Sequence, residues 1–301
     1  MNLRQINYLL AIVEEGSFTR AARRLAVAQP SLSQQVRALE RELGGPLLER
    51  MPNGVQLTAA GRAFLPEARS AAAHAARAAE AARETLGVPS RELGVATVTS
   101  LAVGLLPAAL ARWHRVHAET TVYLHEFPHR AEMHQAVRGG LGDLGIGPRP
   151  SNWPGPIHPL GWEEFVVVLP AYDSLAQNGN KSVPLSKLAD RDWVLLDPAH
   201  GLSDLTLRAC AQAGFVPRAA VRTGQVTAAA ALAAAGLGPT LLGSHVVPEG
   251  LDAALLRVRP RLVREVVAFT RSGWSPAAEE FLELIGPLPL RSRPRGSELI
   301  G

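Results

Sequence analysis

The feature that most constrains the fold is a change of rhythm near residue 90. Before it, apolar residues follow helical spacing, and a first helix is predicted at 3–14. After it, strand-like and helical runs alternate, beginning with a strand at 93–99 and a helix at 105–117. Such alternation implies a parallel sheet covered by helices. The fold class is therefore α/β with a helical N-terminal part, and a chain of 301 residues allows two or three domains.

The alternation continues through the rest of the chain. Further strands are predicted at 121–127, 144–146, 165–169, 193–196 and 266–270. Further helices are predicted at 131–138, 204–213, 226–235 and 276–285. These elements are expected to form two α/β lobes.

Two short helices joined by a tight turn follow the first helix. Ser17 is predicted to cap the first of them, and Pro30 suits the first position of the second, because its missing amide has no helical partner there. This pair matches the geometry that places a recognition helix in the major groove of DNA. The alternative interpretation is a helical bundle whose polar residues are merely solvated.

A hairpin and a long helix are predicted next. Short extended runs at 47–50 and 55–57 flank the turn residues Pro-Asn-Gly. Thr58 is then expected to cap an Ala-rich helix that reaches about residue 86, before a linker at 87–91. Small side chains along one stripe of this helix would let a partner helix approach closely, and the alternative is a lone helix lying on its own domain. The stripe consists of Phe64, Ala68, Ala71, Ala75, Ala78 and Ala82.

The positive charge of the chain is concentrated at its N-terminus. Residues 1–62 contain eight arginines, no lysine and five glutamates, which leaves +3 of the total net charge of +4. An excess of this sign is what phosphate neutralisation requires, although an ordinary solvated surface is also compatible with it. Gln pairs with adenine, Arg with guanine and Ser with either, so polar residues of the predicted recognition helix and hairpin are candidates. The candidate DNA-binding residues are Gln29, Pro30, Ser31, Ser33, Gln34, Arg37, Arg50 and Asn53.

Three segments carry a resemblance to a known family. The run from Gly16 to Gly44, GSFTRAARRLAVAQPSLSQQVRALERELG, resembles the DNA-binding signature of the LysR-type transcription regulators. The segments PLLER, ending at Arg50, and LTAAG, ending at Gly61, stand where that family has its wing and the start of its linker helix. The resemblance implies double-stranded promoter DNA as a partner, dimers formed through the linker helices, and commonly tetramers.

The resemblance also implies a division of the chain. We expect a winged helix-turn-helix at 1–58, a linker and dimerisation helix at 59–87, and a two-lobed effector domain similar to periplasmic solute-binding proteins. Lobe I would comprise residues 91–160 plus 268–289, and lobe II residues 161–267. The Arg- and Pro-rich tail at 290–301 is predicted to be disordered.

A small-molecule effector is expected in the cleft between the lobes. Strand ends and helix N-termini form the walls in such folds, and they offer backbone amides and a partial positive charge to an anionic group, so a small organic acid is favoured. Each candidate is otherwise an ordinary loop residue. The candidate effector-binding residues are Thr99, Ser100, Pro128, His129, Gly147, Pro148, Asp197, His200, Gln225 and Thr227.

Other classes of protein find little support. The single cysteine, Cys210, cannot form an internal disulfide, which favours a reducing cytoplasm. The N-terminus lacks the pattern of a signal peptide, and the most apolar stretch, 227–243, is too short to span a membrane. The nine histidines lack zinc-like spacing, and no nucleophile elbow or phosphate loop occurs. We therefore expect no metal, no cofactor and no enzymatic activity.

Two hypotheses remain. In the first, the protein is a DNA-bound switch whose effector changes the angle between lobes or dimers. In the second, it is a small-molecule-binding protein or enzyme whose N-terminal helices only mediate oligomerisation. The second predicts DNA affinity that does not depend on Gln34 and Arg37.

Overall fold

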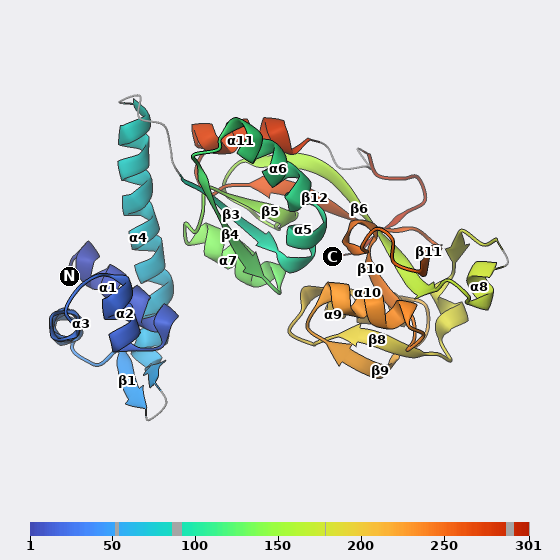
Figure 1. Ribbon diagram of the computed structural model, residues 1–301, viewed down its shortest axis with the longest axis horizontal. Helices are drawn as coiled ribbons and strands as arrows, with labels where there is room; N and C mark the ends of the chain where they lie inside the picture. Colours follow the sequence, from blue (N-terminus) through green and yellow to red (C-terminus); the bar gives the residue numbers. More distant parts are fainter. Residues whose placement is uncertain (52–53, 86–91, 178, 287–291, 301) are drawn as a thin grey trace. The chain divides into compact units, whose positions relative to one another are not determined.

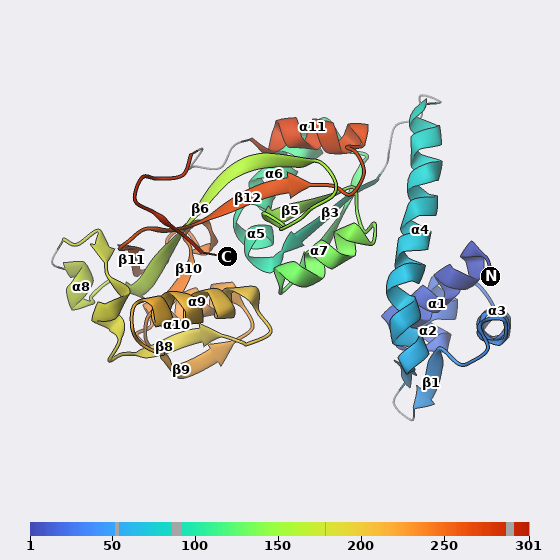
Figure 2. The ribbon, with the colours of Figure 1, turned by 180° about the vertical axis from the view of Figure 1, so that it is seen from behind.

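The computed structural model describes residues 1–51, 54–85, 92–177, 179–286 and 292–300. The chain divides into two units, residues 1–90 with 136–142, and residues 91–135 with 143–301. Figures 1 and 2 show their elements from opposite sides. The linker predicted at 87–91 lies outside the described residues.

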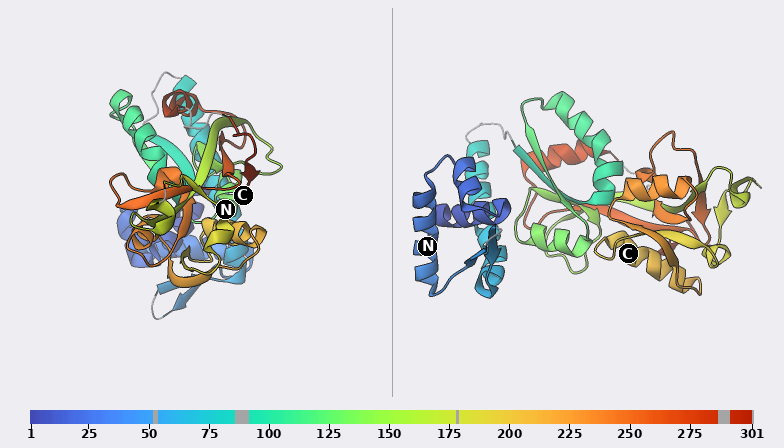
Figure 3. Two further views of the ribbon diagram at one scale, coloured as in Figure 1. Left: turned by 90° about the vertical axis from the view of Figure 1, so that its right-hand side faces the viewer. Right: turned by 60° about the horizontal axis from the view of Figure 1, so that its bottom comes forward.

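The first unit is built from helices and one hairpin. Its elements are α1 (Leu3–Glu15), α2 (Phe18–Arg24), α3 (Gln29–Leu43), β1 (Leu48–Met51), β2 (Gly54–Leu57) and α4 (Ala59–Thr85). Helix α1 packs against α4, and α2 and α3 pack on α1 and on each other (Figures 1 and 3); the three helices share a core that includes Leu9, Ile12 and Leu39. The helices and the hairpin expected in this part of the chain are confirmed.

Local hydrogen bonds fix where these helices begin. The Ser17 hydroxyl accepts from the Arg20 amide at 3.4 Å, and the Thr58 hydroxyl accepts from the Gly61 amide at 2.9 Å. Both caps were predicted from the sequence and are confirmed. Pro30 is the second residue of α3 rather than the predicted first, a position where its missing amide still has no helical partner.

Lobe I of the second unit is built on a parallel sheet. Its strands β3 (Glu92–Val98), β4 (Thr121–Phe127) and β5 (Leu144–Pro148) pair with β3 in the middle. In Figure 1, α6 and α11 lie together on one face of this sheet and α7 on the other. The helices of the lobe are α5 (Thr99–Gly104), α6 (Leu106–Val116), α7 (Arg130–Arg138) and α11 (Pro276–Ile285).

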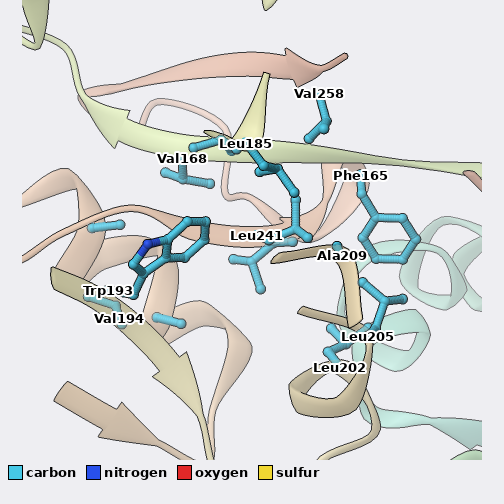
Figure 4. Close-up of a cluster of buried hydrophobic side chains, with 14 of the residues drawn as sticks. Phe165, Val168, Leu185, Trp193, Val194, Leu202, Leu205, Ala209, Leu241 and Val258 are labelled. Carbon is cyan, nitrogen blue, oxygen red and sulfur yellow. The ribbon is translucent and has the colours of Figure 1, made fainter. Parts of the chain in front are cut away.

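Lobe II has its own apolar core. Side chains of Phe165, Trp193, Leu205 and Leu241 converge there from three strands and from α9 (Figure 4). The strands of the lobe are β7 (Ser182–Val183), β8 (Asp192–Leu196), β9 (Arg218–Thr223), β10 (Thr240–Gly243) and β11 (Ala253–Val258). Its helical elements are α8 (Ser174–Gln177), η1 (Leu185–Leu188), α9 (Gly201–Gln212), α10 (Val226–Ala234) and η2 (Ser244–Val246).

One long strand runs through both lobes. The first part of β6 (Ile157–Pro170) pairs antiparallel with β12 (Leu262–Phe269), and its second part pairs antiparallel with β10 and β11. The sheet is therefore mixed, whereas alternation alone predicted a parallel one. The sequence predicted only 165–169 of β6, because the preceding residues include Pro159 and Gly161, which are unfavourable in strands.

The C-terminal tail departs from the sequence prediction. Residues of β13 (Glu298–Leu299) pair parallel with β12, and Ile300 is buried. The Ser297 hydroxyl also donates to the Pro294 carbonyl at 2.7 Å. The expectation of disorder is wrong for residues 292–300, because the edge of β12 supplies backbone partners and the lobe II core buries Ile300.

A glycine at the start of α4 gives a test of the packing in the first unit. A Cβ at Gly61 would overlap the Leu47 carbonyl oxygen, which is backbone and cannot move aside cheaply. We expect Gly61→Ala to lower the free energy of unfolding by about 1–3 kcal/mol, measured by urea unfolding of the full chain. Gly45→Ala is the matched control, because nothing lies within 4 Å of its Cβ, and its effect should stay within about 1 kcal/mol. Equal effects of the two variants would contradict the packing described here.

Candidate functional site

A polar groove lies along α3 and the segment that follows it. Leu32, Val36 and Leu39 pack into the core of the first unit, so the remaining faces of the helix point outward. The groove is lined by Gln29, Pro30, Ser33, Gln34, Arg37, Glu40, Arg41, Gly44, Gly45 and Pro46. The segment therefore combines one buried apolar face with one accessible polar face.

The candidate DNA-binding residues of α3 gather on this surface with different exposure. Pro30, Ser31, Gln34 and Arg37 are exposed, whereas Gln29 is half-buried. Ser33 lines the groove but is only 6% exposed. Asn53 lies outside the described residues, as does the side chain of Arg50, whose backbone belongs to β1.

A cavity of about 120 Å³ lies between the two lobes of the second unit. Lobe I contributes residues at the end of β3, at the start of α5 and at the start of α7, and lobe II contributes the start of α9. The lining residues are Val98, Ser100, Pro128, His129, Arg130, His200, Gly201, Leu202, Asp204, Leu205, Arg208 and Arg264. The Gly201 amide donates to the Pro128 carbonyl at 2.9 Å, which joins the two lobes beside the cavity.

Four candidate effector residues line this cavity and six do not. The four are Ser100, Pro128, His129 and His200. The six that lie outside its lining are Thr99, Gly147, Pro148, Asp197, Gln225 and Thr227.

Some of these six have structural roles of their own. The Thr99 hydroxyl donates to the Phe127 carbonyl at 3.2 Å, and Gly147 is buried where a Cβ would overlap Met133. The Pro148 carbonyl lies 3.1 Å from Nε2 of His134.

The sequence missed the charged residues of the cavity. Arg130 begins α7, and Asp204 and Arg208 lie one turn apart on α9. The position of Arg130 and Asp204 in the first turn of a helix was a signal that could have identified these two, whereas Arg208 lies further along α9. Arg264 comes from β12, and no local pattern places a residue of this strand beside the first turn of α9.

His200 lines the cavity and carries a buried donor that has no partner among the described residues. Its Nδ1 accepts from the Leu202 amide at 3.2 Å, so the neutral ring carries its proton on Nε2. Nε2 is buried and has no hydrogen-bond partner within the described part of the chain, and His200 is only 4% exposed. Burial, followed by the charge of Arg264, lowers the pKa of His200 and keeps the ring neutral.

A buried ion pair stands behind the cavity. Nε of Arg264 donates to Oε2 of Glu163 at 2.8 Å, and the two residues face each other across the pairing of β12 with β6. The guanidinium carbon of Arg264 also lies 5.4 Å from the centre of the Phe165 ring. His245 Nε2 lies 3.6 Å from the other carboxylate oxygen of Glu163, and burial lowers the pKa of that histidine.

Arg130 lies among more positive than negative charges. Burial lowers the pKa of Arg130, and the charges of Arg208 and Arg264 lower it further, whereas Asp204 raises it and is the weakest of the four influences. Positive charges therefore outweigh negative ones at this wall of the cavity, which favours an anion there.

Two family models match successive parts of the chain. The family model for "Bacterial regulatory helix-turn-helix protein, lysR family" matches residues 3–62, and that for "LysR substrate binding domain" matches residues 86–287. The chain belongs to the LysR family. It is thus a DNA-binding transcription regulator with an effector-binding domain, and the resemblance noted in the sequence is confirmed.

Individual relatives extend along most of the chain. The HTH-type transcriptional regulator TfdS of Cupriavidus pinatubonensis is 32% identical over 250 residues, covering 82% of this chain and 83% of that protein. A probable hydrogen peroxide-inducible genes activator of Streptomyces viridosporus is 32% identical, covering 92% and 90%. The crystal structure of full-length CbnR complexed with its target DNA is 28% identical, with a TM-score of 0.66 and coverage of 95% and 99%.

The described residues form neither a membrane-spanning helix nor a metal-binding cluster. No helix among them is both long and apolar enough to cross a bilayer. Nor do three or more His, Cys, Asp or Glu side chains within those ranges form a group that could hold a metal ion.

The ion pair behind the cavity gives a second test. Glu163→Ala leaves Arg264 buried without its counter-charge, and we expect a loss of about 3–5 kcal/mol in the free energy of unfolding of the effector domain. Glu265→Ala is the control, because it breaks the more exposed Arg149–Glu265 pair of the same unit and should cost about 1 kcal/mol or less. Denaturant unfolding followed by tryptophan fluorescence measures both, and a Glu163→Ala variant as stable as Glu265→Ala would contradict the buried pair.

Proposed function

We propose that α3 reads operator DNA, and that the regulator is switched by a small organic acid bound in the cavity between the lobes. Gln29, Pro30, Ser31, Ser33, Gln34 and Arg37 contact base edges or phosphates, while Arg50 and Asn53 contact the backbone or the minor groove. The observation that carries the DNA part of this proposal is the exposure of Gln34 and Arg37 on a helix whose opposite face is held in the core.

The functional form is a dimer joined through α4, and dimers assemble into tetramers. Ala68 is buried beside the N-terminal helices, whereas Ala71, Ala78 and Ala82 further along the same helix are exposed. The first part of α4 therefore lies on its own domain, whereas the later part leaves small side chains accessible to a partner helix. A dimer presents two recognition helices to two half-sites, so the operator has an imperfect two-fold symmetry.

The effector acts from the cavity through a change in the angle between lobes or dimers. Support comes from Ser100, His129 and His200, which lie on its walls, and from the excess of positive over negative charge around Arg130. A cavity of about 120 Å³ is slightly smaller than one of roughly 150 Å³ that holds benzene, so the ligand has at most about the size of a single ring. The protein acts in the cytoplasm as a regulator and not as an enzyme.

DNA binding tests the recognition surface directly. We expect the double variant Gln34→Ala, Arg37→Ala to lose at least about tenfold in specific affinity, because each bidentate base contact is worth about 1–3 kcal/mol. The measurement is fluorescence anisotropy with the upstream intergenic DNA of the gene and a scrambled duplex, at low and near-physiological salt.

Arg115→Ala is the control for that measurement. Arg115 is exposed on α6 of the effector domain, outside both α3 and the proposed dimer helix α4, and its removal takes away the same charge. Equal losses in the two variants would mean that net charge and not α3 governs binding. Unchanged affinity in the double variant would overturn the proposed recognition surface.

Thiol oxidation is not the signal in this protein. Cys210 is the only cysteine of the chain, it is fully buried on α9, and burial raises its pKa to about 12. A thiol in this state is a poor nucleophile toward peroxide. We therefore do not expect this chain to respond to hydrogen peroxide, although the name of one relative indicates such a response for that protein.

Peroxide treatment is expected to leave this protein unchanged. Hydrogen peroxide should change neither the DNA affinity of the native protein nor the mass of the Cys210-containing peptide. Cys210→Ala should behave like the parent chain in the same anisotropy assay. An oxidised Cys210 together with altered DNA binding in the parent alone would contradict the proposed reversible effector.

A further inference from the structure

The cavity between the lobes carries one uncompensated positive charge. Three arginines line it, and one of them, Arg264, is already paired with the buried carboxylate of Glu163. Of the remaining two, Arg130 and Arg208, one is balanced by Asp204, the acidic residue of the lining. Asp197 lies outside the lining, and its influence on His200 is weaker than that of Arg264.

His200 adds no charge to this balance. Burial and the charge of Arg264 lower its pKa and keep the ring neutral. Its Nε2–H is a buried donor without a partner among the described residues, and leaving such a group unpaired costs free energy. A ligand that supplies an acceptor atom there removes this cost. His129 lies 3.7 Å from Asp204 through its Nε2, on the opposite wall.

Among the described residues, the rest of the wall holds no further arginine or lysine. Val98, Leu202 and Leu205 border the cavity with buried apolar side chains, and Ser100 contributes a hydroxyl, so no other cation of this kind is present for a second carboxylate. A second carboxylate in this space would be desolvated against the apolar side chains and would also exceed the single available positive charge.

We infer that the effector is a monoanion with one carboxylate and an apolar body, and that Arg130 and the Nε2–H of His200 bind the carboxylate. The inference rests on the proposed effector site and narrows it from small organic acids in general to monocarboxylates. The apolar body lies against Val98, Leu202 and Leu205. Dicarboxylates of the same carbon skeleton are disfavoured by the charge balance.

Isothermal titration of the full chain with matched ligands tests the inference. The probes are benzoate and its dicarboxylate counterpart phthalate, hexanoate and its counterpart adipate, and the neutral amide benzamide. We expect each monocarboxylate to bind at least about tenfold more tightly than its dicarboxylate, and benzoate at least about tenfold more tightly than benzamide. Tighter binding of the dicarboxylates or of benzamide would overturn the inference while leaving the proposed effector site standing.

Variants of cavity residues test the charge balance and the role of the His200 donor. Asp204→Asn removes one negative charge and leaves both Arg130 and Arg208 uncompensated, so the preference for mono- over dicarboxylate should fall by about tenfold. Asp252→Asn, at an exposed position of lobe II, should leave the preference unchanged. His200→Phe should weaken benzoate binding by about tenfold or more through loss of the donor. An unchanged preference in Asp204→Asn would overturn the charge balance.

The DNA-binding assay distinguishes a failure of the proposed effector site from a failure of the proposed recognition surface. If neither class of acid binds, both the monocarboxylate inference and the proposed effector site fail, while specific operator binding by the same preparation leaves the DNA-binding part of the proposal intact. If acids bind as expected but no duplex is bound specifically, the inference stands and the recognition surface fails.

Discussion

The pairing of Glu163 with Arg264 is the interaction on which the effector domain depends. It joins β6 to β12 near the point where the chain leaves lobe I for lobe II, and the side chain of Glu163 is fully buried. Removing two charges from water is costly, and the cost is offset here by short charge-assisted hydrogen bonds and by the nearby Phe165 ring. Because Arg264 also lines the cavity, this interaction both joins the two strands and neutralises one of the arginines of the cavity wall.

The position of α9 follows from the core of lobe II. Leu202, Leu205 and Ala209 recur at three- and four-residue spacing and pack into that core, as Figure 4 shows. Their burial fixes the helix so that Asp204 and Arg208 line the cavity beside Leu202 and Leu205. His200 caps the same helix through Nδ1, which leaves its buried Nε2 without a partner among the described residues. The apolar packing of this helix thus determines which of its polar groups lie at the cavity.

In α3 of the DNA-binding unit, too, apolar packing determines which residues remain accessible. Apolar residues of α3 hold one face in the core, and the polar residues between them remain accessible. The candidate surface on α3 could therefore be predicted from the sequence almost completely, since periodicity alone assigns each residue to a face. The cavity could be predicted only in part, because Ser100, Pro128, His129 and His200 follow strand ends or begin helices, whereas the arginines that set its charge do not share one local pattern.

The sequence by itself determined the helices of the first unit, the strands β3, β4, β5 and β8 and the family of this protein, because caps such as Ser17 and Thr58 and the apolar stripes act over a few residues. It did not predict β9, β10 or β11. The tertiary structure alone decided the length of β6, the ordered tail and the place of Arg264. Each of these depends on partners far away in the chain: β6 is completed by β12, the tail by the edge of the same strand, and the charge of Arg264 by Glu163. Hydrogen bonds and ion pairs between distant segments form only once the chain has folded, so no local pattern records them.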